Sequence, residues 1–351
     1  MKIIIVGNLG YIGPCVTQRF RTNFPQAELI GYDIGYYAQS LSSSEYLPEV
    51  ELDRQIFGDI RKFPEALLDG VDGVVNLAAI SNDPMGNEYE NVTMEVNYRA
   101  AVRLAELCKR KKVRNYVYAS SCSIYGSASE FPKSESDTLN PLTAYARSKV
   151  AAELELEPLA DEDFTVTCLR FATACGFSNR LRLDLVLNDF TAGALVNHLI
   201  DILSDGSPWR PMINTKDMAR AIEWGVQRPS ESGSPFLAVN TGSNEWNNQI
   251  RPLAEAVASQ IPNTAVSLNK EALADKRSYQ VNFDLYKQLA PNHQPEWNLK
   301  DTIRELKEGL ETLNFQDVNF RQSSFVRLYA LTRLREKGLL NNDLEWTRLA
   351  S

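Results

Sequence analysis

Short runs of apolar, mostly β-branched residues alternate with longer amphipathic segments through the first half of the chain. The runs fall at residues 3–6, 29–32, 74–77, 116–119 and 166–169, with a marginal one at 55–57. Runs of this length are typical of strands buried on both faces, and their alternation with helix-length segments predicts βαβ units around a parallel sheet. Because such sheets bind ligands at the carboxyl ends of their strands, we expect the functional residues there.

The pattern loosens after Gly176. Residues 180–194 are predicted to form a loop that leads into a helix, 204–211 are rich in turn residues, and 236–240 form one more strand. Most of the remainder has helical character. The sequence therefore predicts an α/β fold, a Rossmann-type doubly wound parallel sheet with a smaller, mostly helical C-terminal lobe. We assign 1–175 to the nucleotide-binding domain, with 209–245 returning to it, and 176–208 and 246–351 to the lobe.

Composition narrows the range of partners. The 351 residues include 37 Lys and Arg against 45 Asp and Glu, a net charge of −8, which argues against nucleic acid or an anionic membrane as the main partner. No window approaches about 18 uninterrupted apolar residues, so no transmembrane helix is expected. The two histidines, His198 and His293, are far apart, and we expect no metal site.

Cysteine usage and the N-terminus bear on the compartment. The five cysteines form no C-x-x-C pair and their number is odd, which favours reduced thiols and a cytoplasmic location over a disulfide framework. The apolar run at the N-terminus is too short for a signal peptide and ends in glycines instead of a cleavage site.

A glycine-rich loop follows the first predicted strand and precedes a helix that begins at Pro14. It reads G-x-x-G-x-x-G and contains Gly7, Gly10, Tyr11, Ile12 and Gly13. Glycines allow a tight turn and let the backbone approach a pyrophosphate, which then lies at the helix N-terminus. Asp33 ends the second strand, where a carboxylate binds a ribose 2′-hydroxyl and repels a 2′-phosphate. We therefore predict NAD rather than NADP, with Asp59 and Ile60 beside the adenine.

Tyr145 and Lys149 lie four residues apart in a predicted helix over 143–156, so both side chains share one face. A nearby ammonium favours phenolate and is predicted to lower the pKa of Tyr145 from about 10 toward neutrality. Tyr145 is then a general acid/base and Lys149 a ligand of the cofactor ribose. A solvent-facing pair is the alternative. Hydroxyls at Ser120, Ser121 and Ser123 follow the fifth run, where they either bond a substrate oxygen or satisfy their own loop.

In this order, the motifs resemble the extended short-chain dehydrogenase/reductase family, and within it the nucleotide-sugar epimerases and dehydratases such as UDP-glucose 4-epimerase. The resemblance covers most of the chain. Its further matching residues are Asn76, Leu77, Ala78, Ala79, Asn97, Tyr125, Gly126, Leu169, Arg170, Phe171, Gly176, Asn188, Trp209, Arg210, Pro211 and Asp217.

The resemblance implies a role for each group. Ser121 hydrogen-bonds the sugar hydroxyl being oxidised, Tyr145 removes its proton as hydride passes to nicotinamide, and Lys149 orients the cofactor ribose. It adds cofactor contacts at Leu77, Ala78, Ala79, Asn97 and Phe171, and substrate contacts at Ser81, Ser123, Thr173, Asn188, Arg210 and Arg277, with 81–84 a further candidate for the sugar. Guanidinium forks match diphosphate oxygens, although a surface ion pair is the alternative for each arginine. Helical stretches 87–112 and 143–158 correspond to the family's dimer interface, which implies a homodimer.

Departures from the family pattern narrow the reaction. Cys122 and Ser123 stand where 4,6-dehydratases carry an Asp-Glu pair, which disfavours that elimination. Thr173 and Phe177 replace an asparagine and a proline of the family, so the sugar pocket differs from that of UDP-galactose 4-epimerases. The leading hypothesis is an NAD-dependent 4-epimerase of a nucleotide-diphosphate sugar. The alternatives are an NAD(P)-dependent reductase or dehydrogenase of a keto nucleotide-sugar and a non-catalytic NAD-binding regulator, against which the Ser/Tyr/Lys set argues.

Overall fold

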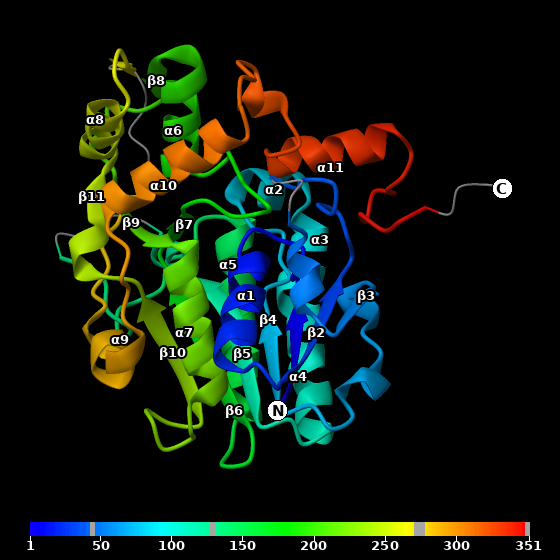
Figure 1. The fold of residues 1–351 in the computed structure, drawn as a ribbon. Helices are drawn as coiled ribbons and strands as arrows, with labels where there is room; N and C mark the ends of the chain where they lie inside the picture. The colour runs from blue at the N-terminus through cyan, green and yellow to red at the C-terminus, as the bar shows by residue number, and fades with distance from the viewer. Residues whose placement is uncertain (43–45, 127–130, 270–277, 348–351) are drawn as a thin grey trace.

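A computed structural model describes residues 1–42, 46–126, 131–269 and 278–347 (Figure 1). Its centre is a seven-stranded sheet of order β10-β6-β5-β4-β1-β2-β3 in which every neighbouring pair is parallel. The strands are β1 (Lys2–Val6), β2 (Glu28–Asp33), β3 (Arg54–Phe57), β4 (Gly73–Asn76), β5 (Asn115–Ser121), β6 (Thr165–Phe171) and β10 (Phe236–Thr241). The predicted doubly wound parallel sheet is confirmed.

Helices cover both faces of this sheet, which explains why its strands are apolar on both sides. On one face lie α1 (Gly13–Asn23) and α7 (Thr215–Gln227), and on the other α4 (Ala101–Arg110) and α5 (Ala144–Leu156). In β1, Ile3 and Ile5 belong to the core beneath α1, whereas Ile4 and Val6 belong to the core beneath α4. Successive side chains of a strand point to opposite faces, so a continuous apolar run is needed to fill two cores.

The second half adds a smaller lobe with its own core, and its strands exceed the prediction. A three-stranded sheet contains β11 (Asn247–Gln249), β9 (Trp209–Asn214) and β7 (Thr173–Cys175), and a two-stranded sheet pairs β8 (Leu199–Ile202) with β12 (Ala265–Leu268). The sequence analysis predicted a mostly helical lobe and did not identify these strands, since strands of three to six residues give too short a pattern. The lobe's helices are α6 (Val186–Asn197), α8 (Ile250–Gln260) and α10 (Leu299–Thr312), whereas α9 (Asp284–Leu289) packs against β10 in the core of the main sheet.

The remaining helices lie near the carboxyl edge of the main sheet. They are α2 (Asp83–Glu88), α3 (Glu90–Met94), a π-helical turn over Glu95–Ala100 that continues into α4, and α11 (Arg327–Glu336). Figure 1 shows α11, in red, above the sheet and close to α2. Within the described ranges, no helix combines the length and apolar character required to cross a membrane.

Candidate active site

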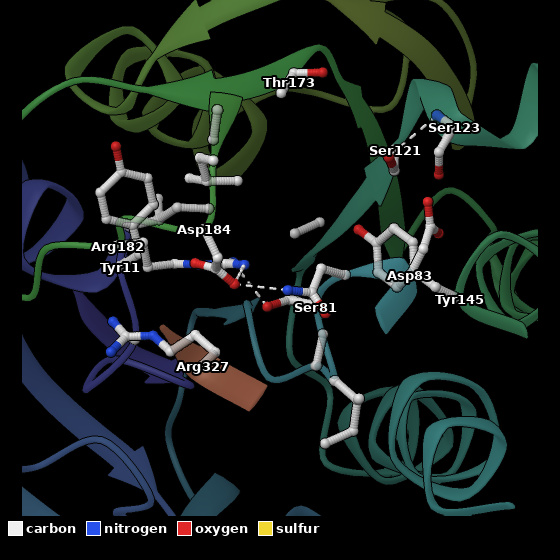
Figure 2. Close-up of a pocket in the computed structure, with 18 of the residues that line it drawn as sticks. Tyr11, Ser81, Asp83, Ser121, Ser123, Tyr145, Thr173, Arg182, Asp184 and Arg327 are labelled. Atoms are coloured by element: carbon white, nitrogen blue, oxygen red, sulfur yellow. Dashed lines mark hydrogen bonds and ion pairs between the residues drawn. The ribbon is translucent and has the colours of Figure 1, made fainter. Parts of the chain in front are cut away.

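A cavity of about 960 Å³ runs along the carboxyl ends of the central strands, between the sheet and the lobe. The glycine loop, Asp33, the Ser121 strand end and the Tyr145 helix face line it from the sheet side, and Arg210 lines it from the lobe. Figure 2 shows Ser121, Ser123 and Tyr145 on one side of the cavity, with Tyr11 and Arg327 on the opposite side. The predicted strand-end location of the site is therefore what the structure shows.

The glycine loop needs glycine for two different reasons. Gly7 has φ +87°, and a Cβ there would lie 2.5 Å from the backbone nitrogen of Ala78. A Cβ on Gly13 would lie 1.9 Å from the carbonyl oxygen of Asn8, so Gly13 allows α1 to start against the turn. Gly7, Gly10, Tyr11 and Ile12 line the cavity. Gly13 is absent from the cavity wall, and its part in cofactor binding is to place the helix N-terminus.

Asp33 ends β2 and lines the part of the cavity where the sequence analysis predicts the adenosine of NAD, which we call the adenosine end. Its two carboxylate oxygens accept hydrogen bonds from the backbone nitrogens of Leu9 (3.0 Å) and Gly35 (2.7 Å). Burial raises the pKa of Asp33, while these bonds and the charges of Arg180 and Arg327 act in the opposite direction. The carboxylate is thus oriented by backbone donors and lines the cavity, as binding to ribose hydroxyls requires.

Asp59 and Ile60 line the same end. The carboxylate of Asp59 is gripped by the guanidinium of Arg61, with Nη2 at 2.6 Å from Oδ2. The predicted acceptor for the adenine amino group is therefore already engaged in an ion pair, and Ile60 presents the apolar edge beside it.

Ser121, Tyr145 and Lys149 come together from β5 and α5. Thr143 caps α5 through its hydroxyl, which accepts from the backbone nitrogen of Ala146 at 3.1 Å, so the helix starts just before Tyr145. Lys149 Nζ donates to the carbonyl oxygen of Ala119 (2.6 Å) and lies 5.7 Å from the centroid of the Tyr145 ring. Tyr145 and Lys149 thus lie on one face of α5, as their four-residue spacing predicts.

The predicted pKa of Tyr145 was wrong in direction. Burial raises it to about 12, opposed by a hydrogen bond with Ser121, and the charge of Asp83 raises it further. Burial also lowers the pKa of Lys149 to about 7. Lys149 is buried and Tyr145 is half-buried in the cavity wall, and desolvation of each charged form outweighs the attraction on which the sequence argument relied. At neutral pH the phenol of Tyr145 therefore holds its proton.

Asp83 adds a carboxylate beside this group. It lines the cavity at the start of α2, and its Oδ1 accepts a hydrogen bond from Thr143 Oγ1 at 2.7 Å. Figure 2 shows the carboxylate next to the Tyr145 ring. The sequence indicated this segment only as a candidate for the sugar.

Four of the predicted substrate residues line the cavity: Ser81, Ser123, Thr173 and Arg210. Ser81 Oγ accepts from Arg182 Nη1 (2.9 Å). Ser123 Oγ is buried and has no hydrogen-bond partner within the described part of the chain. The Arg210 guanidinium lies 5.8 Å from the centroid of the Tyr279 ring. Leu77, Ala78, Ala79 and Phe171, predicted for the cofactor, also line it.

Two predicted contact residues lie beneath the cavity instead. Asn188 is fully buried, its Nδ2 donates to Tyr11 Oη (2.9 Å), and its Oδ1 accepts from the Gly176 nitrogen. Asn97 is likewise buried and exchanges two hydrogen bonds with the backbone of Ile80. Their amides are consumed by the protein, so these asparagines brace the cavity wall and are not placed to touch a ligand. Arg277 lies outside the described residues.

Arg182 and Asp184 are cavity residues that the sequence analysis missed. They form a largely buried ion pair (2.9 Å), and Asn82 Nδ2 donates to Asp184 Oδ2 at 2.6 Å. The available signal was the alternation L-R-L-D-L at 181–185, where two opposite charges interrupt an apolar stretch. Figure 2 shows this pair reaching into the middle of the cavity toward Ser81.

All five cysteines are free, and four of them are buried. Cys122, which follows Ser121, has its Sγ 3.0 Å from the carbonyl oxygen of Arg170, and burial raises its pKa. A buried thiol of this kind is a packing group and not a nucleophile.

A model of the NAD dependent epimerase/dehydratase family matches residues 3–242. The chain belongs to this family. The family's cofactor is NAD, and the glycine cradle, the oriented Asp33 and the buried cations fit that group. A Bacillus subtilis relative, the uncharacterized UDP-glucose epimerase YtcB, is 28% identical over 258 residues, which cover 70% of this chain and 78% of YtcB.

Solved structures of other proteins share the fold. MoeE5 in complex with UDP-glucuronic acid and NAD has a TM-score of 0.75 and 22% identity, covering 89% of this chain and 99% of MoeE5. TunA, an NAD-dependent NDP-hexosamine 5,6-dehydratase, has a TM-score of 0.75 and 20% identity, covering 91% and 99%. About a tenth of this chain therefore has no counterpart in these structures.

Proposed function

We propose that this protein is an NAD-dependent epimerase of a nucleotide-diphosphate sugar that acts through a transient 4-keto intermediate. The observation that carries the proposal is the meeting of Ser121, Tyr145 and Lys149 in the same cavity as the glycine loop and Asp33. Proton transfer and hydride transfer require that a reacting carbon lie between an acid/base group and the nicotinamide. A single cavity that holds both sets of residues meets this requirement.

The chain's own residues supply the proton chemistry. When bound, NAD takes up and returns a hydride and brings a positive charge that favours the phenolate. Ser121 Oγ hydrogen-bonds the C4 oxygen, and Tyr145 Oη takes the hydroxyl proton during oxidation and gives it back during reduction. Lys149, held by the Ala119 carbonyl, binds the cofactor ribose and stabilises the phenolate.

Both sides of the cavity provide substrate contacts, Arg210 and Thr173 from the lobe's three-stranded sheet and Ser81 and Ser123 from the main sheet. Arg210 offers a guanidinium to the diphosphate, a group whose paired oxygens match its donors. Ser81, Ser123 and Thr173 offer hydroxyls to the sugar. The size of the cavity allows cofactor and substrate to lie end to end, with the sugar at the Ser121 side.

Epimerisation at C4 is favoured because it needs only these groups. Oxidation and reduction use the same hydride and the same tyrosine proton, whereas elimination of water needs a further acid/base pair. The two positions after Ser121 supply none, since Cys122 is buried and Ser123 is a hydroxyl. An intact acid/base tyrosine also disfavours a purely regulatory NAD-binding protein.

The test is a product analysis with the purified protein. Cofactor released by denaturation is identified first, and native protein is then incubated with UDP-, dTDP-, GDP- and CDP-sugars in D2O and followed by NMR. We expect a C4 epimer with no net NADH and no deuterium at carbon. Stoichiometric turnover of free cofactor would establish a reductase or dehydrogenase instead. Loss of water would establish a dehydratase, and deuterium uptake at C3 or C5 would point to Asp83-assisted enolisation.

A further inference from the structure

The last described part of the chain packs against loops near the N-terminus. Residues 326–347, which we name the C-terminal strap, contain α11 and a turn closed by the bridge between Leu340 and Trp346. In Figure 1 the strap runs across the top of the molecule to the edge near β2 and β3. It therefore lies at the adenosine end of the cofactor site.

The strap holds the loop that follows Asp33. Tyr36 Oη donates to the carbonyl oxygen of Leu344, and Trp346 Nε1 donates to the carbonyl oxygen of Ile34 at 2.7 Å. The Arg327 guanidinium lies 4.3 Å from the centroid of the Tyr37 ring. Three positions of one short loop, Ile34, Tyr36 and Tyr37, thus contact the strap.

The strap also holds the segment that follows Asp59. Arg61 grips the Asp59 carboxylate and donates through Nη1 to the carbonyl oxygen of Asp343 at 2.7 Å. Lys62 forms an exposed ion pair with Glu345 at 2.7 Å. The two loops that carry the predicted adenosine contacts are therefore joined by one partner.

Packing shows that the strap is part of the fold. Leu331, Leu340 and Leu344 are buried in the same core cluster as Ile60 and Phe63. Burial of these apolar side chains favours the docked position of the strap.

Arg327 brings into this region a buried charge that has no direct ion-pair partner among the described residues. It is 1% exposed, Nη2 donates to the carbonyl oxygen of Arg180 (2.9 Å), and Nη1 has no partner in the part of the chain that the structure describes. The neighbouring Arg180 and Arg182 are each paired, with Glu49 and Asp184, whereas no carboxylate of the described residues lies within ion-pair distance of Arg327. Burial lowers its pKa to about 10, so it remains charged at neutral pH.

The start of α11 adds to this positive potential. Val326, Arg327 and Leu328 line the cavity, the helix has no side-chain cap, and its first turn contains no acidic residue. The end of a ten-residue helix with unsatisfied N–H groups attracts anions. Two independent features thus place positive charge at the same wall of the cavity.

We propose that the C-terminal strap is an integral part of the NAD site, in which the strap immobilises both adenosine loops and Arg327 supplies positive charge to the cofactor pyrophosphate. Arg327 is a positioning residue: its buried positive charge attracts the pyrophosphate of the cofactor and takes no part in the reaction. The proposal depends on NAD as the cofactor and not on the reaction that the enzyme catalyses, so failure of the epimerase proposal leaves it intact.

The charge is tested with Arg327→Gln, with Arg327→Lys as the rescue and Arg333→Gln as the control on the exposed side of the same helix. Exchange of bound NAD against isotopically labelled NAD, and the affinities for ADP and adenosine, are measured on the full chain. We expect Arg327→Gln to speed the exchange of bound NAD and to lower the affinity for ADP about tenfold or more, while the affinity for adenosine changes little. Arg327→Lys restores most of the loss, and Arg333→Gln behaves as wild type.

Immobilisation of the loops is tested with Trp346→Phe, which keeps an aromatic ring beside Tyr36 and removes the donor to Ile34. This substitution loosens the loop that follows Asp33 without changing its charge. We therefore expect the affinities for ADP and adenosine to fall together, by about two- to fivefold.

Three results would overturn the proposal. One is wild-type NAD exchange in Arg327→Gln. Another is loss of UDP affinity with ADP unchanged, which would assign the charge to the substrate. The third is equal loss with Lys and Gln at position 327 together with a lower melting temperature of the cofactor-free protein, which would show a role in folding alone.

Discussion

The two ends of the cavity are built in opposite ways. The catalytic end draws Ser121, Tyr145 and Lys149 from one stretch of chain, on β5 and α5. The adenosine end joins segments separated by about three hundred positions, as in the hydrogen bond from Tyr36 to Leu344. The three residues proposed for proton transfer are thus held by two elements that are neighbours in sequence and in space. The proposed adenosine site, in contrast, is complete only when the last part of the chain packs against the first.

The ends also differ in how they treat charge. At the catalytic end, burial opposes the charged forms of both Tyr145 and Lys149. At the adenosine end, the Asp33 carboxylate accepts two backbone hydrogen bonds, and Asp59 is paired with Arg61. Burial opposes the charged form of Asp33 as well, but two backbone hydrogen bonds and the nearby arginines act against it, so the two ends differ in how far a buried charge is compensated.

The largest effect is expected from Tyr145→Phe, which removes the acid/base hydroxyl and keeps the ring. Turnover should fall by about 10³-fold or more, because proton transfer by a placed side chain contributes 10²–10⁴. Bound NAD per chain, measured after denaturation, should be unchanged because the adenosine end is intact. Activity within tenfold of wild type would remove Tyr145 from the mechanism.

Lys149→Met tests the cost of the buried amine. Between pH 7 and 10.5 the unfolded chain binds a proton that folded Lys149 does not, so wild-type stability rises with pH across this window. The variant lacks this penalty and should be more stable by roughly 2–4 kcal/mol below pH 7, with the difference vanishing toward pH 10.5. Urea unfolding of the cofactor-free protein measures it.

Lys300→Met, at an exposed position of α10, serves as the control and should leave the pH profile of wild type unchanged. If Lys149→Met follows the wild-type profile as well, the amine is not held against its charged form.

Asp33→Asn probes the adenosine end without altering side-chain shape. Loss of the charged acceptor should lower the affinity for NAD by about 10–100-fold, since hydrogen bonds to charged groups contribute about 1.5–3 kcal/mol. The preference for NAD over NADP should fall as well, because repulsion of the 2′-phosphate is gone. Equilibrium titration with both cofactors decides, and an unchanged preference would place the discrimination elsewhere.

The smallest effect concerns Ser123 and its neighbour Ser120, two buried hydroxyls in different states. Ser123 Oγ has no partner among the described residues, whereas Ser120 Oγ donates to Glu153. Ser123→Ala should raise the free energy of unfolding by up to about 1 kcal/mol and raise the KM for the sugar, whereas Ser120→Ala should lower stability. Destabilisation by both substitutions would mean that Ser123 is satisfied in the protein.

The predictable parts were those that depend on local sequence. Runs such as residues 3–6 predicted the strands, and the glycine loop with Asp33 indicated one wall of the cavity that the structure shows. Short strands such as β8 give no usable period, and the pKa of Tyr145 depends on burial, which a four-residue spacing does not report. The amides of Asn97 and Asn188 are consumed by partners that only the folded chain reveals. Nothing local to Arg327 marks it as a wall of the cavity.

The C-terminal strap also has a consequence for the order in which the protein matures. The nucleotide-binding sheet can begin to assemble once its strands have been synthesised, but the partners of Tyr36 and Arg61 are made only with residues 343–344. A growing chain therefore has its catalytic serine, tyrosine and lysine long before it has a complete adenosine end. If the strap has the role proposed above, stable capture of NAD follows synthesis of residues 343–344 and is one of the last steps in maturation.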